Sequence, residues 1–354
     1  MHPSGTVAAG AQPARHPAAR AGDRLRARGE GGSEGGCAGC AQPGAGAVSV
    51  AKAPPRFGRF EILQLLGRGG MAEVYKARIV EGTRAGQVIA LKRLAPKLAA
   101  DPEAVDLFTV EADVSRLLKH PNIVEVLEAG VVGEMYYLAM EYVDGRDLGM
   151  VLARCRERKI FLPVPFALYI VRRVLDALAY AHEARGPTGL HLNIIHCDVS
   201  PSNLFISRLG EIKLGDFGIA KVRSMGGDSN ETLWGKLAYL APEQLDRGPL
   251  TPRVDLWGSA LALYEILGNQ RTFQGSNTEQ LQQAVRHGQI QPLEELRKDL
   301  PSGLAHVLRR ALNRDPDKRY QTAAEFSDAL KPFHDEMVGE ALGIASVVRG
   351  LFKQ

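Results

Sequence analysis

The sequence predicts an α+β fold, with a small sheet domain that contains one helix followed by a larger, mainly helical domain. Short apolar runs broken by glycine and polar residues are typical of strands between residues 57 and 132. Beyond the connector Asp144-Gly145-Arg146, apolar residues recur over longer stretches at helical spacing, at 164–185, 254–268 and 303–312. This change of pattern predicts two domains of different architecture.

Local signals predict the main elements in turn. The first strand is expected at Phe57–Leu66, where apolar residues crowd into a run that ends in glycines. Asp101-Pro102-Glu103 combines an N-cap, a first-turn proline and an early acid, so a helix is expected to begin there. Another strand is expected at Met135–Glu141, and two short strands lie within the helical domain, near Leu204–Ile206 and Ile212–Leu214.

We expect four segments: a tail at 1–55, the sheet domain at 56–141, the helical domain at 142–332 and a helical extension at 333–354. The tail is rich in Ala, Gly, Pro and Arg and has almost no aromatic or branched apolar residues, which predicts disorder. Apolar residues of the extension repeat at helical spacing, so it is expected to pack against the helical domain rather than bind a partner or a membrane. These residues are Met337, Ala341, Ile344, Val348 and Leu351.

Charge and apolar content exclude several classes of protein. The net charge is +4, and the first 56 residues hold seven Lys and Arg against three Asp and Glu, so the rest of the chain is formally neutral. A nucleic-acid-binding surface needs basic excess on the folded part, so this role is disfavoured. No apolar run approaches the roughly 20 residues of a membrane-spanning helix, so no membrane span is expected.

The cysteines predict a cytoplasmic protein without a disulfide framework. The four of them, Cys37, Cys40, Cys155 and Cys197, are too few and too scattered for such a framework. Cys37 and Cys40 have the spacing of a zinc knuckle, but the remaining ligands of a four-ligand site are not evident. An inert pair in the tail is therefore the expected state.

A glycine-rich segment separates two strand patterns and could approach a phosphate closely. Glycines let backbone N–H groups face an anion without a Cβ atom in the way. Considered alone, such a segment is more often an ordinary turn, because glycine-rich hairpins are common. Its residues are Leu66, Gly67, Arg68, Gly69, Gly70, Met71, Ala72, Glu73 and Val74.

A lysine at the end of the next strand is a candidate partner for such a phosphate. Lys92 ends the apolar run that contains Ala90, and Glu111 lies on the helix that follows. A lone lysine after a strand is usually a solvated surface charge. An ion pair with Glu111 would instead hold the ammonium group in place.

Two motifs of the helical domain predict phosphoryl transfer most strongly. His196-Cys197-Asp198-Val199-Ser200-Pro201-Ser202-Asn203 is followed by Asp216-Phe217-Gly218 between two short strands. Asp198 supplies a candidate base, and Asn203 and Asp216 supply hard oxygen ligands for magnesium. The order of glycines, lysine, base and magnesium ligands is the one that transfer from ATP requires.

With these motifs the chain resembles the eukaryotic-like (Hanks-type) Ser/Thr protein kinases, especially those of bacteria, over residues 57–332. The resemblance extends to Ala241-Pro242-Glu243, to Asp255 and to Arg319. It implies a two-lobed protein-kinase fold, with a small antiparallel-sheet N-lobe and a larger helical C-lobe that hold ATP and Mg²⁺ between them. It also implies a role in bacterial signalling.

The resemblance also implies a role for each matching residue. Asp198 is expected to be the base, Asn203 and Asp216 the magnesium ligands, and Lys92 the phosphate-binding lysine with Glu111 as its partner. The glycine-rich segment Leu66–Val74, Ala90 and Lys92 would line the nucleotide site. Met140 would guard the back of the adenine pocket, Glu141 to Val143 would form the hinge, and Glu243 would pair with Arg319 to brace the C-lobe.

Departures from the family pattern concentrate around the base. Ala72 replaces a glycine, which is not expected to prevent ATP binding, and Cys197 replaces an arginine that pairs with a phosphorylated activation loop, so loop phosphorylation is not the expected on-switch. Ser200 replaces a lysine. We hypothesise that Lys236 supplies the missing ammonium group; alternatively Lys236 is solvated and catalysis is weaker.

The expected function is ATP-dependent transfer of phosphate to Ser or Thr of an unspecified protein, in the cytoplasm. A nucleotide-binding pseudokinase scaffold is the alternative, favoured by Ala72, Cys197 and Ser200 and disfavoured by the five intact catalytic positions. Candidate autophosphorylation sites lie between Asp216 and Glu243, where the same residues could simply keep a loop soluble. They are Ser224, Ser229 and Thr232.

Overall fold

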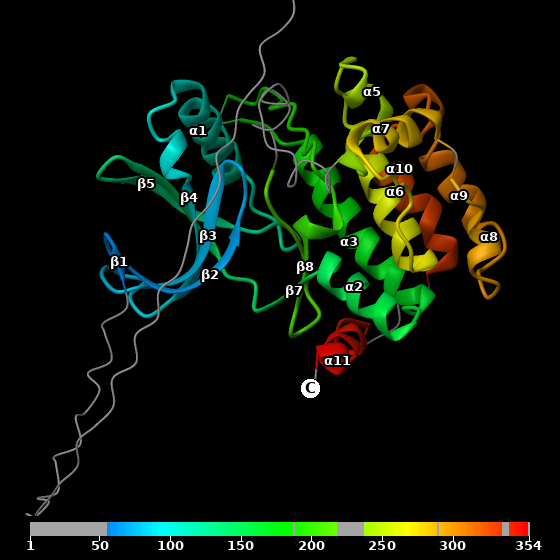
Figure 1. Ribbon diagram of the computed structural model, residues 1–354, viewed down its shortest axis with the longest axis horizontal. Coiled ribbons are helices and arrows are strands. Elements are labelled where there is room, and N and C mark those ends of the chain that lie inside the picture. Colours follow the sequence, from blue (N-terminus) through cyan, green and yellow to red (C-terminus); the bar gives the residue numbers. More distant parts are fainter. Residues whose placement is uncertain (1–54, 187, 218–236, 289, 335–339, 353–354) are drawn as a thin grey trace, which may run out of the picture. The chain divides into compact units, whose positions relative to one another are not determined.

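The computed structural model describes residues 55–186, 188–217, 237–288, 290–334 and 340–352. The predicted disordered tail, apart from Pro55, and the Cys37/Cys40 pair lie outside these residues. The described chain has a sheet lobe followed by a helical lobe, so the predicted α+β fold is confirmed (Figure 1).

The N-terminal lobe is built on a six-stranded sheet in the order β1-β2-β3-β4-β6-β5, with every neighbouring pair antiparallel. Its strands are β1 (Arg56–Phe57), β2 (Phe60–Arg68), β3 (Ala72–Ile79), β4 (Val88–Leu94), β5 (Val126–Val132) and β6 (Met135–Glu141). The register pairs Val74 with Lys92, Lys92 with Leu138, and Ala90 with Met140. Since paired residues and residues two apart share a face, these five side chains line one face of the sheet.

One helix, α1 (Pro102–Leu117), packs against this sheet (Figure 1). The Asp101 side chain accepts a hydrogen bond from the Glu103 N–H, and Pro102 occupies the first turn, so the predicted helix start is confirmed. Phe108 and Ala112 are buried in a core cluster with Leu138 and Met140 of β6. This packing fixes the side of α1 that carries Glu111, which is itself buried.

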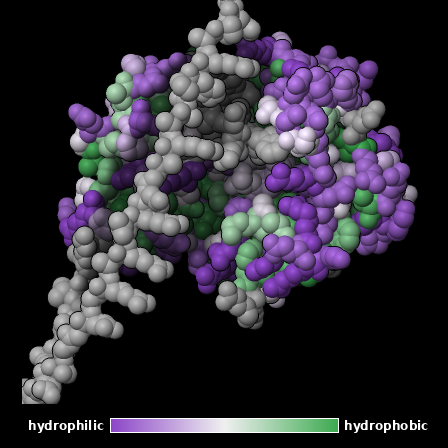
Figure 2. All heavy atoms as spheres, viewed as in Figure 1, coloured by the Kyte–Doolittle hydropathy of each residue, from purple (hydrophilic) through white to green (hydrophobic). Residues whose placement is uncertain are grey.

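Helices dominate the second lobe, and α6 (Arg253–Gly268) runs through its centre. Every residue from Val254 to Gly268 is buried, including the polar Asp255, Ser259 and Glu265. Around α6 lie α2 (Leu148–Arg158), α3 (Val164–His182), α5 (Pro242–Leu245), α7 (Thr278–His287), α8 (Leu293–Leu296), α9 (Leu304–Ala311) and α10 (Ala323–Leu330). The face shown in Figure 2 is largely hydrophilic over this lobe.

A small second sheet corrects one detail of the sequence prediction. Gly145 and Arg146, predicted as part of a connector, belong to β7 (Gly145–Asp147), which pairs with β8 (Leu204–Ser207), and β8 pairs with β9 (Ile212–Leu214). A Cβ atom on Gly145 would lie 1.9 Å from the Ile206 carbonyl oxygen, so this pairing requires glycine. A strand of three residues is too short to show an alternating pattern.

The C-terminal extension forms α11 (Glu340–Phe352), whose Ile344, Val348 and Leu351 are buried against the core of the helical lobe. The helix contacts α2, α3 and β8, so the predicted packing is confirmed for these residues, while Met337 lies outside the described part. Among the described helices, none is long and apolar enough to cross a membrane.

Candidate active site

The glycine-rich segment forms the turn between β2 and β3, at the edge of the candidate nucleotide site. The Gly69 N–H donates to the Ala72 carbonyl oxygen at 2.8 Å, which closes the turn. A Cβ atom added to Gly67 would meet no described atom within 4 Å, and neither Gly67 nor Gly69 adopts a left-handed φ. The backbone conformation at these two positions therefore does not require glycine, and the space beside Gly67 is open on the described side.

Three other residues of the glycine-rich segment differ in their surroundings. Leu66 is exposed, and Arg68 pairs with Glu73 at 3.0 Å. Ala72, which replaces a glycine of the family pattern, is buried in the core cluster that contains Phe108 and Met140. Its methyl group is thus accommodated by packing, which agrees with the expectation that this departure does not prevent nucleotide binding.

Lys92 lies at the centre of the site and bridges the two lobes. Its Nζ atom is 2.5 Å from Glu111 Oε1 and 2.7 Å from Asp216 Oδ1, and the lysine is only 6% exposed. The strand β4, the helix α1 and the segment after β9 each contribute one of these three residues. A buried ammonium group placed between two carboxylates is held in one position.

Asp198 and Asn203 form the second part of the site. The Asn203 Nδ2 atom donates to the Asp198 carbonyl oxygen at 2.8 Å and to Asp198 Oδ2 at 3.0 Å. The Gly215 N–H in turn donates to the Asn203 carbonyl oxygen at 2.9 Å, which ties this loop to the residue before Asp216. The predicted base and both predicted magnesium ligands therefore belong to one connected group.

A buried aspartate on α6 holds the loop that carries the base. Asp255 is fully buried and accepts hydrogen bonds from the backbone N–H groups of His196 at 2.8 Å and Cys197 at 2.7 Å. His182 Nε2 lies 2.8 Å from the same carboxylate. The sequence pointed to Asp255 through the family resemblance, whereas no local signal identified His182.

The helices α6 and α5 also contact the loop that carries Asp198. A Cβ atom on Gly258 of α6 would lie 2.5 Å from the Val199 carbonyl oxygen, so glycine is required where the loop crosses this helix. Gln244 of α5 donates from Nε2 to the Cys197 carbonyl oxygen at 3.1 Å and accepts from the Ala241 N–H at 2.8 Å. The sequence assigned neither residue a role in supporting this loop, because both act through contacts that are distant along the chain.

Cys197 replaces the usual arginine and has an unusual backbone. Its φ of 62° is in the left-handed region, where the hydrogen bond to Asp255 holds it. Burial, followed by the negative charges of Asp255 and Asp198, raises the pKa of the Cys197 thiol well above its usual range. The side chain is therefore a neutral thiol that packs against the lobe core, and its nucleophilicity is low.

The proposed compensation for Ser200 involves a residue outside the described part of the chain. Ser200 is buried, and its Oγ atom is 3.0 Å from the Ser202 Oγ atom. Lys236 lies outside the described residues, so the hypothesis remains a prediction. The candidate autophosphorylation sites Ser224, Ser229 and Thr232 are also outside them.

A salt bridge inside the helical lobe matches the predicted pair. Arg319 is fully buried and donates to both carboxylate oxygens of Glu243, at 2.7 and 2.8 Å. Its guanidinium group also donates to the carbonyl oxygens of Asn313, Arg314 and Arg253, and it lies 4.8 Å from the centre of the Trp257 ring. This pair links α5, which follows the active-site segment, to the core of the lobe.

The expected adenine side of the site lies at the end of β6. Met140 is buried and pairs with Ala90 across the sheet, and Glu141 contacts Lys213 Nζ at 2.5 Å. Residues 142–144 then connect β6 to β7. The roles of Met140, Glu141 and Val143 at the back of the adenine pocket and in the hinge remain predictions from the resemblance.

The residues present fit ATP and magnesium. Because the Asn203 Nδ2 atom donates to two Asp198 oxygens, the Asn203 Oδ1 atom is the acceptor end of this amide, in the loop that the Gly215 N–H ties to the residue before Asp216. An amide oxygen and a carboxylate are the hard ligands that Mg²⁺ prefers, with phosphate oxygens completing its shell. The open space beside Gly67 and the fixed Lys92 ammonium group suit the phosphates.

This fold and this arrangement of residues define a two-lobed protein kinase. The family model described as the protein kinase domain matches residues 60–330, and the chain belongs to this family. Within the family it groups with the eukaryotic-like kinases of bacteria, which confirms the resemblance seen in the sequence.

Several bacterial proteins are similar to this chain. The "Tyrosine-protein kinase MasK" of Myxococcus xanthus is 34% identical over 299 residues, which cover 84% of this chain and 46% of the relative. The "Serine/threonine-protein kinase PrkC" of Bacillus subtilis is 32% identical over 281 residues, which cover 78% and 41%. The chain thus spans less than half the length of these two relatives.

Solved structures support the same assignment. The crystal structure of the Mycobacterium tuberculosis PknI kinase domain aligns with a TM-score of 0.58 and 30% identity. The alignment covers 80% of this chain and 98% of that domain. The similarity therefore extends over a whole kinase domain and not only over the short motifs.

Proposed function

We propose that this chain is an active protein kinase that transfers the γ-phosphate of ATP to Ser or Thr residues of proteins. The observation that carries this proposal is the position of Lys92, which contacts Glu111 and Asp216 at once. In protein kinases, the pairing of this lysine with the helix glutamate and the placement of the metal-binding aspartate are both required for transfer. Membership of the family supports the same conclusion.

Each residue has a defined chemical task in this proposal. When bound, ATP supplies the phosphoryl group that is transferred, and magnesium supplies positive charge that screens the phosphates. Asp198 accepts the proton of the acceptor hydroxyl, Asn203 and Asp216 hold the metal, and Lys92 neutralises phosphate charge. Asp255 and Gln244 keep the loop of Asp198 in position through its backbone.

The alternative is a pseudokinase that binds nucleotide and signals by its shape. Three departures favour it, namely Ala72, Cys197 and Ser200. Against it, the methyl group of Ala72 is packed in the core and Cys197 is held by the same aspartate that orders the loop. All five catalytic positions are present, so transfer is the better-supported function.

The relatives differ in the type of residue that their names give as the phosphate acceptor. One is named a tyrosine-protein kinase, while others, including PrkC and the M. tuberculosis PknA, are named serine/threonine-protein kinases. Ser200 replaces the lysine that is usual in this loop of Ser/Thr kinases, but the loop does not show the tyrosine-kinase pattern. We therefore propose Ser and Thr as acceptors.

Phosphoamino-acid analysis tests both the activity and the acceptor. The purified chain is incubated with γ-labelled ATP, magnesium and a generic protein acceptor, beside an Asp198→Asn sample, and the labelled protein is hydrolysed. We expect label on phosphoserine and phosphothreonine. Label confined to phosphotyrosine would contradict the proposed acceptor, and no label on the chain or the acceptor would favour the scaffold.

Lys236 provides a second test, of the proposed compensation for Ser200. If its ammonium group acts beside the base, Lys236→Met should lower kcat by about tenfold or more, within the range of a single charged group at a reaction centre. The matched surface variant Lys331→Met, which removes an exposed ion pair with Asp328, should leave kcat unchanged. An unchanged kcat in Lys236→Met, in an assay where Asp198→Asn is inactive, would refute the compensation.

We further propose that this domain acts in the cytoplasm. Cys155 and Cys197 are both free thiols among the described residues, which suits a reducing compartment. ATP and protein acceptors for signalling are available in the same compartment.

A further inference from the structure

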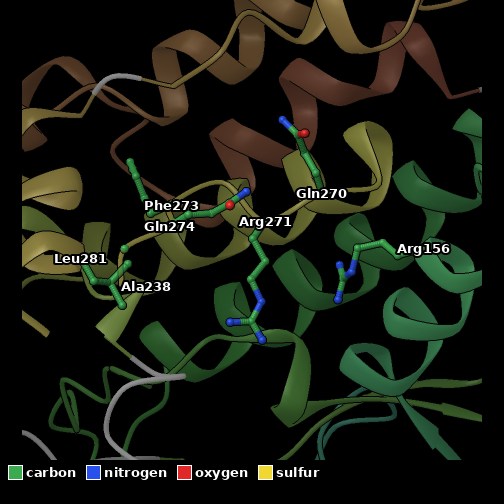
Figure 3. Close-up of a pocket in the computed structure, with 8 residues that line it drawn as sticks. Arg156, Ala238, Gln270, Arg271, Phe273, Gln274 and Leu281 are labelled. Carbon is green, nitrogen blue, oxygen red and sulfur yellow. The ribbon is translucent and has the colours of Figure 1, made fainter. Parts of the chain in front are cut away.

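A pocket of about 440 Å³ opens on the helical lobe, beside the segment that leads into α5. One side is apolar and includes Ala238, Phe273 and Leu281. The other side carries two arginines, Arg156 from α2 and Arg271 from the loop after α6, whose side chains extend into the same space (Figure 3). The pocket therefore combines a hydrophobic wall with two positive charges.

Neither arginine forms an ion pair within the part of the chain that the structure describes. Arg156 Nη1 is buried and has no hydrogen-bond partner there. Arg271 is exposed, and among the described residues it forms no ion pair. A buried donor without a partner is costly and suits a site that a ligand completes. In the same loop, the buried Thr272 Oγ1 atom also has no partner among the described groups.

Glu265 is the acidic residue near these arginines, and its hydrogen bonds are made to other groups. Its Oε2 atom accepts from the Tyr239 hydroxyl at 2.9 Å, and its Oε1 atom accepts from the Thr272 N–H at 3.2 Å. Burial raises the pKa of Glu265 despite the nearby charges of Arg156 and Arg271. Both Glu265 oxygens thus accept hydrogen bonds from other groups, and Arg156 Nη1 stays without a partner among the described residues.

The pocket is connected to the loop of Asp198 by a short chain of contacts. Ala238 and Tyr239 lie just before Ala241, whose N–H donates to Gln244. Gln244 in turn donates to the carbonyl oxygen of Cys197, the residue before Asp198. The segment that contributes Ala238 to the pocket is therefore linked through Gln244 to the residue before Asp198.

We propose that this pocket binds an anionic side chain of the protein substrate, either a carboxylate or a phosphorylated residue near the acceptor. Arg156 and Arg271 would bind the anion through their forked N–H donors, a geometry that matches carboxylate and phosphate groups. The apolar wall would contact the aliphatic part of the same side chain. The inference rests on the proposed function, because it specifies the substrate of that site.

The test uses two sets of peptides with one acceptor serine. In the first set, Asp, phosphothreonine, Arg or Ala is placed in turn at each position from five residues before to five after the serine, and kcat/KM for transfer is measured with the full chain. The second set carries the same sequences with a fluorescein label, and anisotropy gives the Kd of each peptide. At one or two positions, Asp or phosphothreonine should raise kcat/KM over Ala by at least about tenfold, and Arg should lower it.

Variants assign the preference to the pocket. In Arg271→Gln and in Arg156→Gln, the ratio of kcat/KM for the anionic and Ala peptides should fall towards one. The matched control Arg309→Gln removes an exposed arginine of α9 that pairs with Glu294, and it should keep the wild-type ratio. A ratio that is larger for phosphothreonine than for Asp identifies a phosphorylated residue as the ligand, and the reverse identifies a carboxylate.

The outcomes separate this inference from the proposed function. Transfer to peptides without any preference for an anion, or with a preference that survives both pocket variants, overturns the inference and leaves the kinase function intact. If no peptide is phosphorylated, the proposed function fails, and the anisotropy data decide the inference. Binding of anionic peptides that Arg271→Gln abolishes then supports the pocket, and equal binding of all peptides refutes it.

Discussion

Asp198→Asn should abolish phosphoryl transfer and leave the fold and nucleotide binding intact. The loss of kcat is expected to be at least about a hundredfold, because an amide cannot accept the proton of the acceptor hydroxyl. The side chain keeps its size, and its oxygen atom remains able to accept from Asn203 Nδ2. Steady-state kinetics with labelled ATP measures kcat, and titration with a fluorescent ATP analogue measures Kd.

The control for this variant is Asp328→Asn, which alters an exposed carboxylate of α10 that pairs with Lys331. It should change kcat by less than about twofold, as surface substitutions remote from the chemistry usually do. If Asp198→Asn kept more than about a tenth of the wild-type kcat, Asp198 would not be the base. A parallel loss of ATP affinity would instead assign Asp198 a role in holding the metal.

Arg319→Met should destabilise the helical lobe by about 3–5 kcal/mol, which is the cost of leaving one member of a buried ion pair without its partner. Arg319 is fully buried and makes both contacts to Glu243, and three backbone carbonyl groups depend on the same guanidinium. Methionine fills much of the space but donates no hydrogen bond. Urea unfolding followed by circular dichroism measures the free energy of unfolding.

Two further variants identify the cause of this loss. Arg319→Met combined with Glu243→Leu removes the unpaired carboxylate, so it should recover part of the stability that the single variant loses. Arg309→Ala breaks an exposed pair with Glu294 and should cost no more than about 1 kcal/mol. A single variant as stable as the wild type, or a double variant less stable than the single, would show that the Glu243 charge does not determine the effect.

Much of the site could be predicted because its chemistry depends on residues close together in sequence. Asp198 and Asn203 belong to one loop, and the helix start at Asp101 is signalled by three adjacent residues. The family resemblance then paired Lys92 with Glu111 and Glu243 with Arg319. The structure brings both pairs into contact, while their catalytic and stabilising roles remain predictions.

Other parts of the site could not be predicted, because they depend on long-range contacts. His182 reaches the Asp255 carboxylate from α3, and Gln244 reaches the Cys197 carbonyl oxygen from α5. Nothing beside these residues in the sequence indicates those partners. The strand β7 was missed for a related reason, since its three residues become a strand only by pairing with β8.

The sequence by itself determined the protein's chemical capacity. Its glycine-rich turn, its lysine and glutamate, and its two acidic motifs define a kinase domain, because these residue types have that meaning in that order. Only the tertiary structure decided how the loop of Asp198 is supported and that Arg156 and Arg271 line one pocket. The physical reason is that burial and charge pairing arise when segments distant in sequence pack together. The local pattern of apolar residues does not indicate which segments will pack.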